Sequence, residues 1–343
     1  MGEDFHHHSF CQANKFSYLR MWLASRTSLR PKRPGDREET PYMNIILKIL
    51  RALADLPSSL RRTPRPRLIM TLLVKDEADI LEQNILFHKR MGVDGFIITD
   101  NGSTDSTPQI IDRYTRKGWV LEYIREPSGG YEQKRWVDRM AWLAKTKYKA
   151  QWIINADADE FWFPTTGNLK TEPASTHANV LAAEVRNVCP EEGKPYWEWD
   201  STIREVPDLK EYGLSPYSIF SRHYKKVMHR ADGYIQISMG NHKVTMLPHR
   251  ERQGRLIVYH YPVRGREHFM AKMINGGKQL ETHRGKHGGR HWRYFYALHK
   301  EGKLSEEYNR VVGLNCRKRI VRDGFVVRDS RLGLLFDAGN AEN

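Results

Sequence analysis

The sequence of 343 residues predicts an α/β fold built around a parallel sheet. Between residues 68 and 155, short apolar runs alternate with segments whose apolar residues recur at helical spacing. The connections are short, which is typical of parallel strands joined by right-handed helical crossovers. We expect strands at 68–74, 96–99, 119–124 and 152–155, and helices at 80–91, 107–117 and 131–147.

The regular alternation is absent before residue 68. Residues 1–42 lack apolar periodicity and contain a Pro/Arg-rich stretch, so we expect a disordered basic tail. Apolar residues at helical spacing over 44–56 predict a short amphipathic helix, which Pro57 should end. Such a helix either packs on the following domain, which we favour, or lies on an anionic membrane.

The charge balance indicates an anionic partner. Lys and Arg number 56 against 41 Asp and Glu, a net charge of +15. The excess is concentrated in two regions, because residues 1–67 hold 13 basic and 6 acidic residues and residues 221–293 hold 16 and 4. Nucleic acid, acidic lipid, nucleotide phosphate and acidic glycan all fit this balance.

Hydropathy and cysteine usage narrow the class of protein. No run of roughly 18 uncharged apolar residues is present, so no transmembrane helix is expected. The three cysteines lie far apart, which excludes a disulfide scaffold and a cysteine-based zinc site and favours a reducing cytosol.

Carboxylates follow three of the predicted strands, at the edge of a parallel sheet where ligands bind. Asp76 and Glu77 follow the first strand, and Asp100 follows the second. Asp157 and Asp159 follow the fourth, two positions apart on an extended segment, so both side chains can face one way. Paired carboxylates favour Mg²⁺ or Mn²⁺, and in this context we prefer a metal–nucleotide site to a solvated loop.

These motifs resemble those of a known enzyme family. Residues 68–163 look like the nucleotide-binding half of a family 2-type glycosyltransferase with the GT-A fold, through the segments 71–77, 99–105 and 155–161 in that order. The later segments 240–242 and 260–264 are similar to those of a bacterial subgroup often associated with surface polysaccharide.

The resemblance implies a role for each matching position. Asp76 or Glu77 would lie near the nucleotide, and Asp100 would contact the base or ribose. Asp157 would reach the ribose, and Asp159 would coordinate the metal ion that bridges the diphosphate.

Basic residues near the predicted site have two interpretations each. Gln133, Lys134 and Arg135 begin a helix after a glycine pair, where they could meet phosphate or form an exposed turn; Lys134 is our candidate for the donor. A second basic group, which could hold the diphosphate or form a solvated face, consists of Arg264, Arg266 and Lys272. Of these three, Arg264 is our candidate for the diphosphate.

Two histidines end or precede short strands, where an imidazole could complete a metal site or act on the acceptor. We expect His260 to bind the metal and His242 to act in catalysis, although either could be purely structural. The Glu-Asp pair that carries the base in many inverting members is missing after Asp159. The residues open as catalytic base are Glu191, Glu192, Glu198, Asp200, Asp208 and His242.

Together these observations predict a Mn²⁺- or Mg²⁺-dependent, hexosyltransferase-type glycosyltransferase. It would move a sugar from a nucleotide-diphosphate sugar to a glycan, lipid-linked or related hydroxyl acceptor, with inversion expected from the resemblance. We expect it in the cytoplasm, with peripheral contact to an anionic membrane as an option. The alternatives are a non-catalytic protein binding RNA or acidic glycan and a nucleotidyltransferase, but no RNA-recognition motif and no glycine-rich phosphate loop is present.

We expect the chain to consist of five segments. The GT-A prediction places a Rossmann-like sheet with helices on both faces before a C-terminal helical extension. The expected segments are a basic tail (1–42), an amphipathic helix and linker (43–66), a nucleotide-sugar-binding half (67–165), an acceptor and metal-completing half (166–265) and a C-terminal helical region (266–343).

Overall fold

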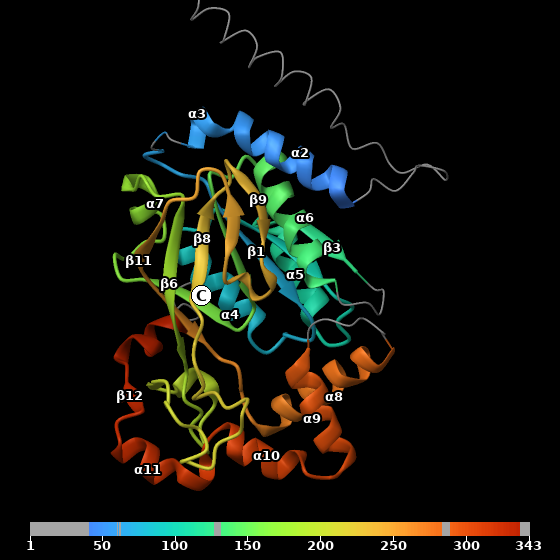
Figure 1. Ribbon diagram of the computed structural model, residues 1–343, viewed down its shortest axis with the longest axis vertical. Coiled ribbons are helices and arrows are strands. Elements are labelled where there is room, and N and C mark those ends of the chain that lie inside the picture. The colour runs from blue at the N-terminus through green and yellow to red at the C-terminus, as the bar shows by residue number, and fades with distance from the viewer. Residues whose placement is uncertain (1–40, 60, 62, 127–131, 283–288, 337–343) are drawn as a thin grey trace, which may run out of the picture.

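The computed structural model describes residues 41–59, 61, 63–126, 132–282 and 289–336 (Figure 1). An eight-stranded sheet forms the centre, in the order β3-β2-β1-β4-β8-β6-β11-β5. Its strands are β1 (Leu68–Val74), β2 (Gly95–Asp100), β3 (Val120–Arg125), β4 (Trp152–Asp157), β5 (Glu160–Pro164), β6 (Val180–Asn187), β8 (Lys226–Arg230) and β11 (Glu251–His260).

The first half of the sheet is parallel, as the sequence predicts. β1 pairs in parallel with β2 and with β4, and β2 pairs in parallel with β3. The chain therefore moves outward from β1 to β3 and then returns to the other side of β1. In open α/β sheets a ligand crevice forms at the carboxyl ends of the two strands where the order reverses.

Helices cover both faces of this half. α4 (Leu81–Arg90) and α5 (Thr107–Arg116) share one apolar core with alternate residues of β1, whereas α6 (Gln133–Thr146) shares a separate core that includes Ile69. Right-handed crossovers place the helices on opposite faces when the chain reverses its direction across the sheet. The predicted α/β class, with helices on both faces, is confirmed.

The second half of the sheet is mixed. β8 pairs antiparallel with β4 and β6, β11 runs parallel to β6, and β5 pairs antiparallel with β11. The register of the last pair sets Glu160 opposite His260. Short elements complete this region: β7 (Ser201–Ile203), β9 (Tyr234–Ile237), β10 (Val244–Met246), α7 (Thr171–Ser175) and 3-10 turns at Tyr196–Glu198 and Met239–Asn241.

A helical region lies beyond the carboxyl edge of the sheet (Figure 1). Its own apolar core includes Phe269, Phe295 and Tyr308, from three different helices. This confirms the predicted C-terminal helical extension. Its elements are α8 (Arg266–Thr282), α9 (Arg290–Lys300), α10 (Leu304–Val311), α11 (Arg317–Arg322), β12 (Val326–Arg328) and 3-10 turns at Leu314–Cys316 and Ser330–Leu335.

The amphipathic helix lies at the opposite end of the molecule. α2 (Pro41–Ala54) packs on α6 and β9, and Lys48 lies 3.3 Å from Asp138 of α6. The preferred interpretation of docking is thus confirmed. The helix breaks before Pro57, which instead lies in the first turn of α3 (Leu56–Ser59), where a missing N–H costs nothing.

The predicted tail falls almost entirely outside the described residues, except that α2 already begins at Pro41. Among the helices in the described ranges, none has the length and apolar composition needed to cross a membrane.

Two fully buried histidines join the sheet to its surroundings. His88 donates from Nδ1 to the Asn84 carbonyl and accepts at Nε2 from the backbone N–H of Trp162. His229 donates from Nδ1 to the carbonyl of the next residue and accepts from the Asn155 amide. Burial lowers the pKa of His88 to about 3 and that of His229 to about 4, so both rings are neutral at pH 7.

We predict that the free energy of unfolding falls as the pH drops from 6.5 towards 4. In this window the unfolded chain binds protons at histidines with an ordinary pKa near 6.5, whereas the folded protein cannot, so stability rises with pH. Each histidine contributes up to about 1.4 kcal/mol per pH unit. Urea unfolding of His88→Gln and His229→Gln should show a shallower pH dependence than that of the exposed His249→Gln. Equal slopes in all three would contradict this account.

Candidate active site

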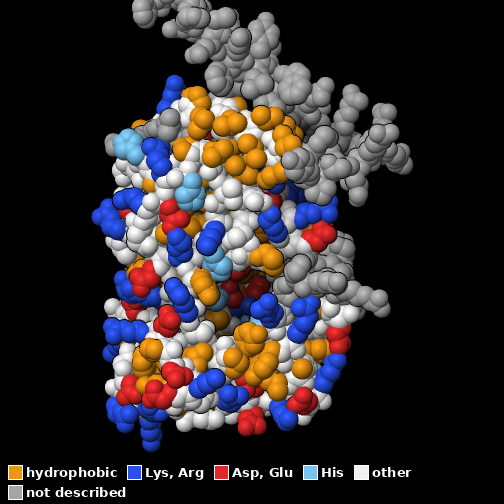
Figure 2. All heavy atoms as spheres, viewed as in Figure 1, with side chains coloured by type: hydrophobic (Ala, Val, Ile, Leu, Met, Phe, Trp, Pro, Cys, Tyr) orange, Lys and Arg blue, Asp and Glu red, His pale blue; other side chains and the backbone are white. Residues whose placement is uncertain are grey.

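A cavity of about 420 Å³ opens at the carboxyl edge of the sheet, where the order reverses between β1 and β4. The residues after these two strands form one part of its wall, and α8 and α9 face them. Figure 2 shows a hollow in the middle of one face, with acidic side chains inside and Lys, Arg and His around it. Seven residues considered from the sequence line the cavity: Asp76, Glu77, Gln133, Asp157, Asp159, His260 and Lys272.

The turn between β4 and β5 holds Asp159 in place. The Asn84 side chain on α4 donates to the carbonyls of Ala158 and Glu160, at 2.8 and 2.9 Å. Asp159 is buried, and its carboxylate lies 3.0 Å from Lys272 Nζ. Burial alone would raise the pKa of Asp159, but Lys272, His260 and Arg264 outweigh it and hold that pKa well below its usual range. The carboxylate is therefore ionised at neutral pH.

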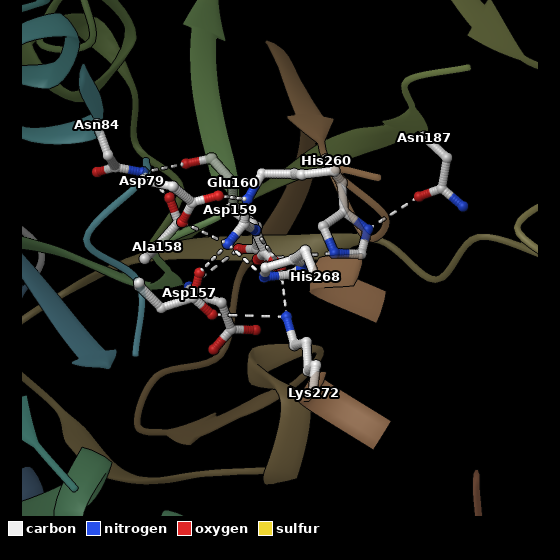
Figure 3. Close-up of polar contacts among 12 residues, drawn as sticks. Asp79, Asn84, Asp157, Ala158, Asp159, Glu160, Asn187, His260, His268 and Lys272 are labelled. Atoms are coloured by element: carbon white, nitrogen blue, oxygen red, sulfur yellow. Dashed lines mark hydrogen bonds and ion pairs between the residues drawn. The ribbon is translucent and has the colours of Figure 1, made fainter. Parts of the chain in front are cut away.

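His260 presents a lone pair to Asp159 (Figure 3). Its Nδ1 lies 2.9 Å from Asn187 Oδ1, and the Asn187 amide nitrogen donates to the Ile219 carbonyl, which fixes the amide orientation. Nδ1 must then carry the proton, and Nε2 lies 3.7 Å from Asp159 Oδ1. Burial lowers the pKa of His260 to about 4. A neutral imidazole facing a carboxylate is a suitable pair of ligands for a divalent cation.

Arg264 lies beneath the cavity wall and does not line it. Its fully enclosed guanidinium is within ion-pair distance of Glu77, Asp79 and Asp159. We predicted that Arg264 holds a diphosphate, but this placement leaves it holding carboxylates. Lys272 of α8 lines the cavity, so the structure offers Lys272 as the cation that a phosphate can reach.

Glu77, Asp79 and His268 bring three potential metal ligands within 4.8 Å of one another. Arg264 Nη2 contacts all three, so the guanidinium already fills this position. His268 Nε2 accepts from Arg264 at 2.7 Å, which leaves the proton on Nδ1. That Nδ1 is buried without a partner among the described residues, and His268 lines the cavity. His268 therefore combines a place in the cavity lining with a ring N–H that has no partner in the described part of the chain.

Lys226 approaches the same turn from β8. It forms an ion pair with Glu160 and lies 3.5 Å from Asp157 Oδ2. Burial raises the pKa of Glu160, an effect that the adjacent Lys226 ammonium opposes, while Glu160 and Asp157 outweigh the burial of Lys226 and raise its pKa. Lys226 is therefore charged at pH 7. The antiparallel pairing of β8 with β4 brings it here, and no local sequence signal indicated it.

Two of the predicted nucleotide ligands have clear local roles. Asp76 has a left-handed backbone, with φ of 51°, and accepts from the Thr104 N–H. Asp100 is buried and accepts from the Ser103 N–H and the Tyr123 hydroxyl. It is the next residue, Asn101, that lines the cavity beside Asp76.

Other predicted residues lie outside the lining. Lys134 donates to Gln236 on β9, and its neighbour Gln133 lines the cavity instead. His242 is half-buried, donates from Nδ1 to the Lys225 carbonyl at 3.0 Å and packs against Tyr224. None of the six residues considered as catalytic base lines the cavity among the described part of the chain.

Sequence reasoning missed several residues that shape the site. No spacing pattern relates them to the Asp-x-Asp motif, because they come from other strands, helices and one loop. They are Asn84, Asp79, Asn187, Lys226 and His268.

Comparison with protein families decides the enzyme class. Residues 70–295 match the sequence model of glycosyltransferase family 92, which covers more than half of the chain. The chain belongs to glycosyltransferase family 92. The predicted glycosyltransferase class is thereby confirmed, while the family 2-type and surface-polysaccharide assignments are not. The sheet and the C-terminal helices agree with the GT-A organisation predicted from the sequence.

Two curated relatives illustrate the range of this similarity. The lipopolysaccharide core biosynthesis glycosyltransferase LpsC of Rhizobium meliloti is 25% identical over 147 residues, covering 43% of this chain and 46% of LpsC. The family 92 protein Os08g0121900 of Oryza sativa is 21% identical over 189 residues, covering 50% of this chain and 30% of the rice protein. The chain thus matches less than half the length of each.

Among solved structures, the mannosyltransferase PcManGT of Pyrobaculum calidifontis, in complex with GDP-Man and Mn²⁺, is 14% identical. The match covers 90% of this chain and 88% of PcManGT, with a TM-score of 0.36. S. aureus TarS 1–349 in complex with UDP is 13% identical, covers 71% of each chain and has a TM-score of 0.35. Scores of this size do not establish a shared fold.

We predict that Arg264→Met lowers the free energy of unfolding by about 3–5 kcal/mol, because it leaves buried carboxylates without their cation. The matched control is Arg266→Met, whose exposed side chain bonds to Ser305 and Asn309 and should cost about 1 kcal/mol. Urea unfolding measures both. Similar losses in the two variants would show that Arg264 is not the centre of this cluster.

Proposed function

We propose that the chain transfers a sugar from a nucleotide-diphosphate sugar to a hydroxyl acceptor, as a metal-dependent hexosyltransferase that inverts the anomeric carbon. The observation that carries this proposal is the pairing of Asp159 with the neutral His260 in a cavity at the sheet's reversal point. Membership of family 92 supports the reaction class. Inversion rests on the family resemblance.

The charges of the cavity support a divalent cation as cofactor. Its lining carries four carboxylates against two lysines, so an anionic diphosphate would meet net negative charge. Asp159 and His260 offer one oxygen and one nitrogen ligand that face each other, which suits Mn²⁺ or Mg²⁺. Bound there, the cation would neutralise charge developing on the leaving diphosphate.

The protein's own residues would bind and orient the donor. Lys272 would reach a phosphate from α8, and the Nδ1–H group of His268, which has no partner among the described residues, would donate a hydrogen bond to an oxygen of the nucleotide sugar. Asp76 and Asp157 line the cavity where the nucleotide would lie. The Asp100 carboxylate already accepts hydrogen bonds from the Ser103 N–H and the Tyr123 hydroxyl. Asp100 would therefore support nucleotide binding indirectly, by holding the turn that follows β2.

His242 is our proposed base for the acceptor hydroxyl. Burial, followed by the nearby Lys226, lowers the pKa of His242, so the ring is neutral at pH 7. Its Nδ1 donates to the Lys225 carbonyl, which leaves Nε2 as the proton acceptor. The acceptor would then have to bring its hydroxyl to His242 from outside the cavity lining.

The acceptor class is proposed from the relatives. LpsC is named for lipopolysaccharide core biosynthesis, which supports a glycan or lipid-linked acceptor of a surface polysaccharide, assembled on the cytoplasmic side of a membrane. The acidic cavity argues against non-catalytic binding of RNA or acidic glycan, despite the net charge of +15.

Asp159→Asn should abolish metal-dependent donor binding while keeping the shape of the side chain. A donor at 100 times its dissociation constant should stabilise the parent protein by about 2.7 kcal/mol in the presence of Mn²⁺. Thermal unfolding with a panel of nucleotide-diphosphate sugars measures this gain. Asp112→Asn changes a half-buried acid on α5 that does not line the cavity; it is the control and should respond like the parent. If Asp159→Asn binds donor and Mn²⁺ as the parent does, the metal assignment is wrong.

The two histidines should separate binding from turnover. His260→Ala should weaken Mn²⁺-dependent donor binding and turnover together, whereas His242→Ala should lower turnover and leave donor affinity nearly unchanged. Calorimetric titration of the donor, with and without Mn²⁺, and steady-state kinetics measure the two effects. Unchanged affinity and turnover in both variants would remove both histidines from the mechanism.

A further inference from the structure

The outer face of α2 carries a stripe of exposed apolar side chains. Ile46, Ile49, Leu50 and Leu53 recur at the spacing of one helical face, and each is exposed by between 37% and 43%. Figure 2 shows a continuous hydrophobic area at the end of the molecule where Figure 1 draws α2. Contiguous exposed apolar patches on a water-soluble surface mark interaction sites.

The opposite face of α2 already has its partners. Ala52 is fully buried, Lys48 pairs with Asp138, and the Arg51 guanidinium lies 5.5 Å from the centre of the Trp142 ring. The helix is therefore fixed to α6 and β9 by one side. The exposed stripe is on a second face of α2, which takes no part in the packing of α2 on α6 and β9.

Exposed cations lie at the same end of the molecule. The linker before β1, described at residue 61 and residues 63–67, enters the sheet at its amino edge, where the Arg67 carbonyl accepts from the backbone N–H groups of Gln151 and Trp152. Arg61, Arg65 and Arg67 are exposed in this linker. Within the described ranges none of the three forms an ion pair with a carboxylate. Lys149, in the loop beside Arg67, is likewise exposed.

We propose that α2 and this linker form a surface that docks on an anionic lipid bilayer. An apolar stripe flanked by unpaired arginines fits the boundary between acyl chains and anionic headgroups. A second copy of the chain fits less well, because four side chains exposed by two-fifths offer a few hundred Å², well below the roughly 800 Å² per partner of a stable interface. The proposal does not depend on the reaction catalysed.

Docking in this way would leave the cavity clear of the lipid. α2 lies at the amino edge of the sheet and the cavity at its carboxyl edge, so the length of β1, about 23 Å for seven residues, separates them. A lipid-linked acceptor would then have to extend from the membrane to be reached, while a donor could enter from the aqueous side.

The experiment is co-sedimentation of the full chain with vesicles of phosphatidylcholine, with or without phosphatidylglycerol. We expect binding to the vesicles with phosphatidylglycerol, weakening as salt is raised, and little binding to those without. Leu50→Asp combined with Leu53→Asp should lower the partition coefficient by more than about tenfold. Arg65→Gln should lower it by about fivefold, the value of one cation near an anionic surface.

Val321→Asp is the matched control, because Val321 is an apolar residue on α11 that is 50% exposed. It should bind vesicles like the parent, and thermal unfolding should show that all variants are folded. Failure of the full chain to bind anionic vesicles would overturn the proposal, as would equal binding by the double variant and the Val321→Asp control. If the parent protein forms a dimer and does not bind vesicles, and only the double substitution makes that dimer dissociate, the stripe is a contact between copies of the chain.

Discussion

The buried guanidinium of Arg264 is the constraint on which the site depends. It lies between Glu77 after β1, Asp79 and Asp159 after β4, at the entry to the C-terminal helical region. A charge enclosed in this way is tolerated only while its partners stay in place. The ion pairs therefore fix three segments, distant in sequence, at one edge of the sheet. They also leave Lys272 on the cavity side, where it can meet a ligand.

Hydrogen bonds to neighbouring side chains give His260 and His268, which both line the cavity, free ring nitrogens of opposite kinds. His260 donates to the Asn187 amide oxygen, so its free nitrogen carries a lone pair. His268 accepts from Arg264, so its free nitrogen carries a proton. Both rings are uncharged at neutral pH, because burial lowers the pKa of each to about 4. The free nitrogen is thus a lone-pair acceptor in His260 and an N–H donor in His268.

The charge of the whole chain is a poor guide to the charge of the site. The net charge is +15, yet the cavity lining holds more carboxylates than lysines. Part of the basic excess of residues 221–293 lies outside the cavity lining: Lys226 and Arg264 neutralise buried acids, and Arg266 packs on Tyr308. The exposed arginines of the linker lie at the other end of the sheet. Composition therefore indicated anionic partners without locating the surfaces that meet them.

The sequence by itself determined the local features of this protein. Apolar periodicity predicted the strands and helices of residues 68–157, and the position of Asp157 and Asp159 directly after β4 predicted the edge of the sheet where the cavity lies. Tertiary structure decided between residues that look alike in sequence. His242 and His260 both lie beside short strands, but only the pairing of β11 with β5 brings one of them to Asp159. Burial likewise separated Arg264 from Lys272, because spacing along a chain records local periodicity, whereas strand pairing and enclosure depend on residues far away in the sequence.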